Sequence, residues 1–233
     1  MLLTSADHER IADAVAAAEA KIRGEIVCVV IDEASPYPET PLAWAAFGAL
    51  VLPLAGLALL KVTAALRHFD APGGWAAAQA AAPHAPVLIA LTGYALLQCL
   101  LFVGIFAVAL VPPVRRSLTP SLLKRARVRE RAVQQFFARG LHKTRERTGV
   151  LIFASLGERQ AEVLADVGID EKVAASDWEA AIADLVAGVR AGRPADGFVA
   201  AIERCGRLLA QHFPAGSEDP DELPNALVES PQR

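Results

Sequence analysis

RTGVLIFASLGERQAEVLADVGI, residues 147–169, contains an apolar run, a tight polar break and a second run, and this order predicts two β-strands joined by a turn. Two strands alone form an unstable hairpin, so the pair needs a further strand. The other stretch of this quality is GEIVCVVID, residues 24–32, which is almost continuously apolar. We therefore expect residues 25–31 to lie beside residues 150–156 in a sheet that is covered on both faces.

The interval between these strand regions is mostly hydrophobic. Residues 40–60 and 86–111 contain no charged side chain, and they are 21 and 26 residues long. About 20 helical residues at about 1.5 Å each cross the hydrocarbon core of a bilayer. The alternative, a pair of buried helices in a large soluble core, is disfavoured by charge-free runs of this length. We predict a transmembrane hairpin of two helices.

Positive charge is concentrated directly after the second apolar run, because residues 112–147 hold 11 of the 23 Lys and Arg side chains. Basic residues next to a span remain on the cytoplasmic side. Both termini are therefore expected in the cytoplasm, and the loop at 61–85 on the opposite side. We expect contact with anionic lipid headgroups from six basic side chains: Arg115, Arg116, Lys124, Arg125, Arg127 and Arg129.

The same basic stretch has a second interpretation, which is a nucleic-acid patch. It lacks interleaved aromatic side chains and any known DNA-binding or RNA-binding motif. We therefore expect membrane lipids, and no nucleic acid, as partners of this segment.

Helical patterns flank the strands. Residues 4–23 have apolar residues at helical spacing, with Ser5 as the expected N-cap and Gly24 as the residue that ends the helix. Further helices are expected over about 124–146, from the capping box at 176–179 to residue 191, and over 194–212. The fold class that follows is α/β, with a small sheet sandwiched by helices and interrupted by the transmembrane hairpin.

The chain divides into four segments on this interpretation. Residues 1–35 and 115–214 are the two halves of one α/β domain, and residues 36–114 are the membrane hairpin. Residues 215–233 are acidic and Pro-rich, which predicts a flexible tail.

Specific residues then carry a family resemblance. Glu19, Lys21 and the pair Gly24-Glu25 lead into the first strand, and RTGVLIFASLGER is followed by AEVLADVGI. In this pattern the chain resembles the TPM domain family, and in particular a bacterial subgroup in which two membrane spans interrupt the domain. The resemblance covers about residues 4–32 and 125–228. It implies a TPM-like sandwich in a bacterial inner membrane and, for some family members, divalent-metal binding or weak phosphatase activity.

Acidic residues gather at the end of the second predicted strand and in the loop after it. Hard oxygen ligands that converge at a sheet end can hold Ca²⁺ or Mg²⁺, and such a metal can orient a phosphate. The candidate ligands are Glu162, Asp166, Asp170 and Glu171, with Glu25 at the start of the neighbouring strand. The alternative is a solvated acidic edge, since Ca²⁺ usually needs six or more oxygen ligands.

Covalent phosphatase chemistry has no support in the motifs. Neither Cys-x5-Arg nor DxDxT occurs, and Ser155 has only half of a nucleophile elbow. Cys28, Cys99 and Cys205 have no metal-ligand spacing, so we expect three small buried hydrophobes.

Two functions remain open. The first is a membrane-anchored interaction or maintenance module whose cytoplasmic α/β domain binds another membrane protein. The second is a weak phosphatase assisted by a divalent metal. The residues leave open whether the protein is an enzyme, because no complete catalytic constellation is recognisable.

Overall fold

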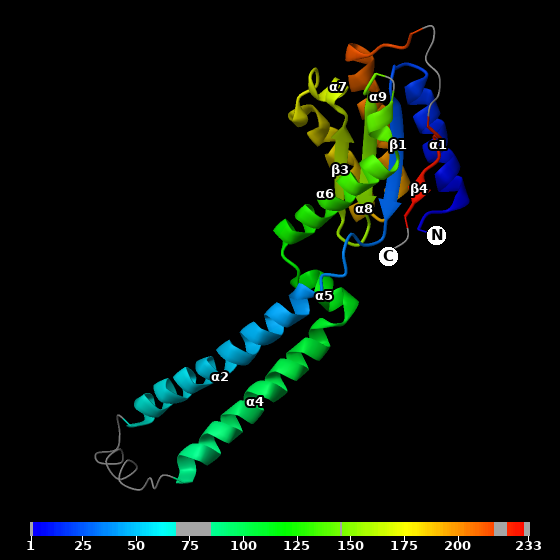
Figure 1. The fold of residues 1–233 in the computed structure, drawn as a ribbon. Coiled ribbons are helices and arrows are strands. Elements are labelled where there is room, and N and C mark those ends of the chain that lie inside the picture. The colour runs from blue at the N-terminus through cyan, green and yellow to red at the C-terminus, as the bar shows by residue number, and fades with distance from the viewer. Residues whose placement is uncertain (1, 69–84, 145, 217–222, 231–233) are drawn as a thin grey trace. The chain divides into compact units, whose positions relative to one another are not determined.

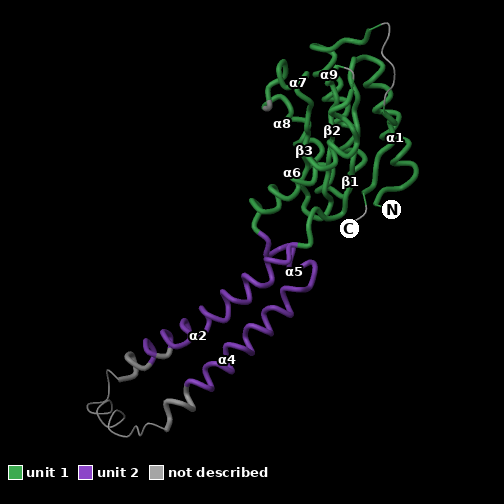
Figure 2. The backbone as a smooth tube through the Cα atoms, viewed as in Figure 1, with its two compact units in different colours: residues 1–36, 120–233 green, residues 37–119 purple. Residues whose placement is uncertain are grey.

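A computed structural model of the 233-residue chain describes residues 2–68, 85–144, 146–216 and 223–230. The chain forms two compact units (Figure 2). Residues 1–36 and 120–233 make the first, and residues 37–119 make the second. We call them the α/β unit and the hairpin unit.

A four-stranded sheet forms the centre of the α/β unit. Its strands are β1 (Glu25–Ile31), β2 (Gly149–Ser155), β3 (Gln160–Ala165) and β4 (Val228–Glu229), in the order β3-β2-β1-β4. β1 runs parallel to β2 over seven residue pairs, from Glu25 opposite Gly149 to Ile31 opposite Ser155. The expected neighbour of the second strand region is therefore the first one, although the hairpin unit separates them in the sequence.

Three helices cover one face of the sheet (Figure 1). They are α1 (Ser5–Glu19), α8 (Glu179–Arg190) and α9 (Pro194–His212). α9 buries Phe198, Ala201, Cys205 and Leu209 at the spacing of one helical stripe. These side chains join the inward-pointing residues of β1 and β2, such as Ile152, in one hydrophobic core.

The helix α6 (Ser121–Ala138) covers the other face. Val128, Ala132 and Phe136 recur every four residues and pack with Phe153 and Leu151 of β2 in a second core. All seven residues of β1 and of β2 are buried, because both faces are covered. The predicted fold class, a small sheet between helices, is confirmed.

Helix starts differ from the sequence predictions. Thr4, and not Ser5, caps α1: its Oγ1 accepts the Asp7 N–H at 3.2 Å, and an Asp7 carboxylate oxygen accepts the Thr4 N–H at 3.2 Å. At the predicted box 176–179 a 3₁₀ turn, Ala175–Trp178, precedes α8, and Asp177 accepts the Ala174 N–H at 3.1 Å. A capping pattern is only local, and a neighbouring polar residue can take the same role.

Gly24 does not end the first helix, since α1 already ends at Glu19. A Cβ at Gly24 would lie 2.7 Å from the carbonyl oxygen of Thr148, so glycine permits the close approach of the chain to the start of β2. Gly192, beyond α8, has φ +71° and is in the left-handed region that a helix end favours.

The C-terminal segment contains a strand that we expected to be loose. Val228 and Glu229 pair with Val29 and Val30 of β1 in parallel. The Glu229 carboxylate accepts the N–H groups of Leu2 and Leu3 at 2.9 and 3.0 Å. Two residues have no detectable sequence periodicity, which is why this strand was missed. The remainder of the predicted tail, 217–222 and 231–233, lies outside the described residues.

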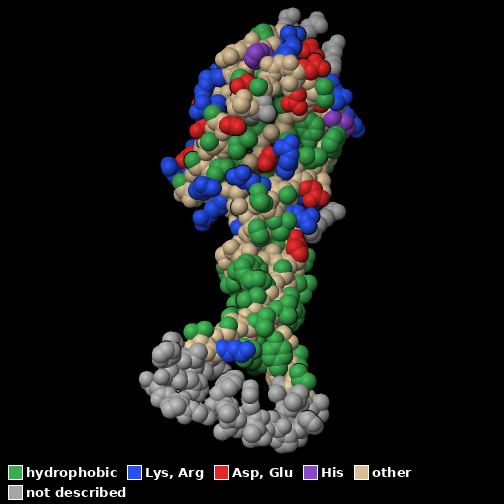
Figure 3. Space-filling model, turned by 90° about the vertical axis from the view of Figure 1, so that its left-hand side faces the viewer, with side chains coloured by type: hydrophobic (Ala, Val, Ile, Leu, Met, Phe, Trp, Pro, Cys, Tyr) green, Lys and Arg blue, Asp and Glu red, His purple; other side chains and the backbone are tan. Residues whose placement is uncertain are grey.

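The hairpin unit consists of α2 (Glu39–His68), α4 (Ala85–Ala109) and the short α5 (Pro112–Leu118). α2 and α4 are both long and apolar enough to cross a membrane, over Glu39–Thr63 and Leu91–Ala109. Only 11% and 0% of the residues in their apolar windows are buried, so neither is a core helix. Hydrophobic side chains cover the visible face of this unit (Figure 3).

Two further expectations for this unit are corrected or limited. α2 continues to His68, eight residues beyond the predicted end of the first span, and most of the predicted loop at 61–85 lies outside the described residues. Cys99 is exposed, whereas Cys28 and Cys205 are buried as expected. Cys99 lies on α4, many of whose apolar side chains are exposed.

Candidate functional site

Asp166 is the most constrained of the predicted site residues. It follows β3 as the N-cap of the short helix α7 (Val167–Asp170), and its Oδ1 accepts the Val167 N–H at 2.8 Å. Arg147 donates twice to the same carboxylate, from Nε at 2.7 Å and from Nη2 at 3.1 Å. The Asp166 side chain is only 3% exposed, whereas the Arg147 side chain is 53% exposed. The exposed Arg147 therefore covers the buried Asp166 carboxylate at the end of β3, and we call this region around α7 the α7 edge.

Electrostatics at this edge follow from that pair. Burial raises the pKa of Asp166, but the hydrogen bonds from Arg147 and from the Val167 N–H outweigh burial and leave the pKa below its usual value. Burial and the neighbouring Asp166 charge raise the pKa of Asp170. Asp170 and Glu171 end α7 and are both exposed. Asp166, Asp170 and Glu171 are therefore grouped around α7 at this edge.

Glu162 lies away from α7, whereas Glu25 is at the same end of the sheet, because it is paired with Gly149, whose carbonyl oxygen accepts the Asp166 N–H. Glu162 stands opposite Phe153 on the face that α6 covers, and Arg129 of α6 donates to it at 3.4 Å. Burial raises the pKa of Glu162 although the Arg129 charge acts in the opposite direction. Glu25 is 8% exposed at the start of β1, and its carboxylate accepts the Leu223 N–H at 3.2 Å.

The five predicted ligands are thus divided among the α7 edge, the α6 face and the start of β1. Within the described ranges of the chain, no group of three or more His, Cys, Asp or Glu side chains is arranged to hold a metal ion. Binding of Ca²⁺ or Mg²⁺ at these acids stays a prediction.

A second polar cluster lies at the opposite end of the sheet, where the central strands β1 and β2 end. Ser155 donates from its hydroxyl to the Glu158 carboxylate, and Glu158 also accepts the Ala34 N–H at 3.0 Å. Glu158 is 7% exposed and Glu33 is 8% exposed, although both are acidic. The Gly157 N–H donates to the Asp32 carbonyl oxygen at 2.6 Å and holds the two strand ends together.

Sequence reasoning missed this second cluster. Its signal was present, because each of the two parallel strands is followed by acidic residues, Asp32-Glu33 and Glu158. In open α/β sheets, ligands bind at the carboxyl ends of parallel strands. In this cluster a buried hydroxyl, that of Ser155, contacts a buried carboxylate, that of Glu158.

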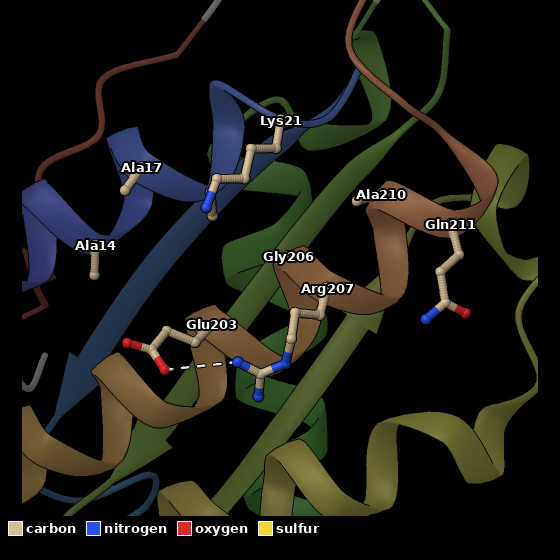
Figure 4. A pocket seen from close by; sticks show the side chains of 9 residues that line it. Ala14, Ala17, Lys21, Glu203, Gly206, Arg207, Ala210 and Gln211 are labelled. Atoms are coloured by element: carbon tan, nitrogen blue, oxygen red, sulfur yellow. Dashed lines mark ion pairs between the residues drawn. The ribbon is translucent and has the colours of Figure 1, made fainter.

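A shallow groove lies between α1 and α9 (Figure 4). Small side chains, among them Ala14 and Ala18, line it together with Gly206, and its volume is about 500 Å³. Glu203 and Arg207 form an ion pair of 3.7 Å at its rim. A Cβ at Gly206 would lie 2.9 Å from the Ala18 Cβ, so the two helices approach each other closely here.

The predicted lipid contacts fall on two helices. Arg115 and Arg116 belong to α5 of the hairpin unit, and the others belong to α6 of the α/β unit. Two of the α6 side chains have acidic neighbours, because Arg127 pairs with Glu130 at 3.2 Å and Arg129 pairs with Glu162. Contact of this set with lipid headgroups stays a prediction.

These features define a class: a three-layer α/β protein in which two apolar helices are inserted between neighbouring parallel strands. The family model of the TPM domain matches residues 114–208, and the chain carries a TPM domain. The match extends from α5 through most of α9, and two of the four strands, β1 and β4, come from outside it.

A solved structure shares the fold. It is the NMR structure of the BA42 protein from the psychrophilic bacterium Bizionia argentinensis, with 18% identity and a TM-score of 0.55. The similarity covers 98% of this chain and 95% of that one. No curated protein matches the chain.

Proposed function

We propose that the protein is a membrane-anchored interaction module of the bacterial inner membrane, whose cytoplasmic TPM domain binds another membrane protein. The observation that carries this proposal is the position of the insertion. α2 and α4 lie in the chain between β1 and β2, which are hydrogen bonded along their whole length. The domain is therefore joined to the hairpin by two covalent connections, so both halves of its sheet stay attached to a bilayer that holds the hairpin.

The charge distribution supports a cytoplasmic domain. Arg115 and Arg116 come within seven residues of the end of α4, and further cations follow in α6. Each basic residue near an anionic surface contributes roughly 1 kcal/mol of attraction. Together these residues favour the orientation in which the α/β unit faces the anionic cytoplasmic leaflet.

A reporter enzyme fused after Arg233 tests the orientation. We expect activity from a reporter that works in the cytoplasm and none from a reporter that requires the periplasm. The opposite result would place the TPM domain outside the cytoplasm. A variant with Arg115, Arg116, Lys124 and Arg125 changed to Gln is the matched control, and we expect it to give mixed orientation because the charge bias is reduced.

The binding function is tested by photo-crosslinking of the full-length protein in native membranes. A photoreactive residue replaces Ala17, which lines the α1–α9 groove, or Leu122, which is 79% exposed on α6. We expect at least one position to give a discrete adduct with a second membrane protein. An excess of full-length protein without the photoreactive residue should reduce the yield of this adduct. Crosslinks to lipid alone at both positions would contradict an interaction module.

The second candidate function is a weak phosphatase assisted by a divalent metal. The α7 edge favours it, because the lowered pKa keeps Asp166 ionised near neutral pH beside Asp170 and Glu171. An ionised carboxylate could contribute to binding a hard cation that orients a phosphate. Ca²⁺ or Mg²⁺ would be the cofactor.

Phosphate release from a generic phosphomonoester, with and without a chelator, separates the two functions. If the phosphatase function holds at the α7 edge, activity is chelator-sensitive and is lost in both Asp166→Ala and Asp170→Ala, whereas Glu162→Ala on the α6 face and Glu179→Ala at the start of α8 retain it. If the wild-type protein with added Ca²⁺ or Mg²⁺ releases no more phosphate than buffer does, the phosphatase function is rejected. The predicted metal ligands then have a structural role only.

A further inference from the structure

We propose that the hairpin unit is a self-association site, in which two copies of this chain pair through one groove between α2 and α4 and hydrogen bond through Gln98. This inference goes beyond the proposed interaction of the TPM domain, because it concerns the other unit and a different partner.

Gln98 is a polar side chain in an apolar helix. It lies near the middle of α4, which has no charged residue along its 25 positions. Its Nε2 donates to the Tyr94 hydroxyl at 3.3 Å. Among the described residues this is its one hydrogen bond, which leaves the carbonyl Oε1 and the second N–H unmet. Lipid hydrocarbon supplies neither donors nor acceptors, so a polar group from another helix is required to complete the amide.

A groove gives access to this amide. It lies between α2 and α4 and has a volume of about 340 Å³. Its α2 side is formed by Ala46, Ala49 and Leu50, and its α4 side includes Gln98 and Cys99. Small side chains let a further helix approach closely, which is the usual basis of helix association in membranes. Lipid chains can fill such a groove but cannot satisfy the amide.

A second copy of the chain fits this groove chemically. A primary amide carries its donor and its acceptor on the same group, so two Gln98 side chains related by a two-fold axis can each donate to the other. The groove lining contains no charged residue, and therefore it does not require a partner of opposite charge. The self-complementary amide, in an uncharged groove, favours an isologous dimer of four helices.

Cys99 provides a reporter within the same groove. It is exposed, whereas Cys28 and Cys205 are buried. Oxidation of membranes that contain the full-length protein is expected to join two Cys99 thiols in a disulfide, with copper phenanthroline and oxygen as the oxidant that removes two electrons and two protons. The product has twice the 24.6 kDa mass of one chain. Cys99→Ser is expected to abolish it.

Gln98→Leu tests the role of the amide. Leucine is a strong helix former and is accepted by lipid, so the hairpin is expected to keep its fold. We expect the dimer dissociation constant, measured by energy transfer between labelled copies diluted in liposomes, to rise about tenfold, because interhelical hydrogen bonds have modest strength in membranes. The rate of Cys99 crosslinking is expected to fall in parallel.

The matched control moves the thiol away from the groove. Leu100 is 71% exposed and does not line it. In the double variant Cys99→Ser, Leu100→Cys, crosslinking is expected to be far slower than through Cys99. Equal rates at the two positions, a crosslinked product that contains a different protein, or a dissociation constant unchanged by Gln98→Leu would each overturn the proposal.

Discussion

The two units contain the same apolar residue types but place them in opposite environments. Phe153 at the centre of the sheet is 0% exposed, whereas Leu96 and Leu100 of α4 are 70% and 71% exposed. The α/β unit removes its apolar surface from water by packing helices on both faces of a sheet. The hairpin unit leaves that surface open, because two helices packed on each other bury only a small part of their apolar side chains.

Polar groups differ between the units in the same way. In the α/β unit, Asp166 is buried and is completed by Arg147 and by the Val167 N–H. Among the described residues of the hairpin unit, Gln98 has one hydrogen bond, to Tyr94 on its own helix. The comparison shows that the α/β unit supplies several hydrogen-bond donors to its buried Asp166, whereas the described part of the hairpin unit supplies Gln98 with Tyr94.

The largest expected effect comes from breaking the core of the α/β unit. Phe153→Ala removes a fully buried side chain, and we expect it to lower the free energy of unfolding by about 3–5 kcal/mol because it leaves a cavity. Circular dichroism during thermal unfolding of the full-length protein in detergent measures this. Leu100→Ala, on the exposed side of α4, is the matched control and should change unfolding by less than about 1 kcal/mol. Equal losses would show that the two units do not differ as described.

An intermediate effect is expected for Arg147→Ala. It leaves the buried Asp166 carboxylate without its bidentate donor, and we expect a measurable loss of stability that is smaller than for a fully buried pair because the Arg147 side chain is 53% exposed. Arg193→Ala breaks the exposed pair with Asp196 and should cost close to nothing. A loss of stability as small as that of Arg193→Ala would mean that hydrogen-bond donors other than Arg147 stabilise the buried Asp166 carboxylate.

The same ion pair predicts a pH dependence. The pKa of Asp166 is lowered in the folded protein, so its contribution to stability is present above the unfolded value of 3.8 and is lost as the pH falls through the folded pKa. We expect the wild-type protein to lose more stability than Arg147→Ala between pH 5 and pH 2, a window set at roughly one to two units around that value. Parallel losses in the two proteins would contradict the assignment.

The smallest expected effect concerns the N-cap of α1. Thr4→Ala removes the cap of α1, and we expect it to lower stability by about 1 kcal/mol because the Asp7 N–H loses its acceptor. Ser5→Ala, one residue along, should stay within about 0.5 kcal/mol of the wild type. The same thermal unfolding experiment compares them, and the reverse order would restore Ser5 as the cap.

Much of the fold could be predicted where burial leaves a continuous pattern. β1 was expected at 25–31 and occupies Glu25–Ile31, and α9 has the expected bounds of 194 and 212. Predictions that depended on one or two residues fared worse, as at Ser5 and Gly24. Those positions are decided by contacts with Asp7 and Thr148, and no local pattern contains the distant Thr148.

The candidate site was less predictable than the fold. Acids that are close in the sequence were expected to converge, but Glu162 points to α6 and pairs with Arg129, while Asp166 has turned into the cap of α7. The spacing of acidic residues along a strand does not predict which charged side chains the covering helix places next to them, as Arg129 of α6 is placed next to Glu162. The cluster of Ser155 and Glu158 with the end of β1 was missed because its members are more than 120 positions apart, as the separation of 124 between Ala34 and Glu158 shows.

By itself, the sequence determined the two charge-free helices, the buried strands and the family, because hydrophobic periodicity and run length depend only on local order. The tertiary structure alone decided which charges pair, which glycine allows a close approach, and which cysteine is exposed. Those outcomes depend on groups that the fold brings together from distant positions. Arg147 meets Asp166 because β3 returns antiparallel to β2, whereas the partner that Gln98 has among the described residues, Tyr94, lies on the same helix.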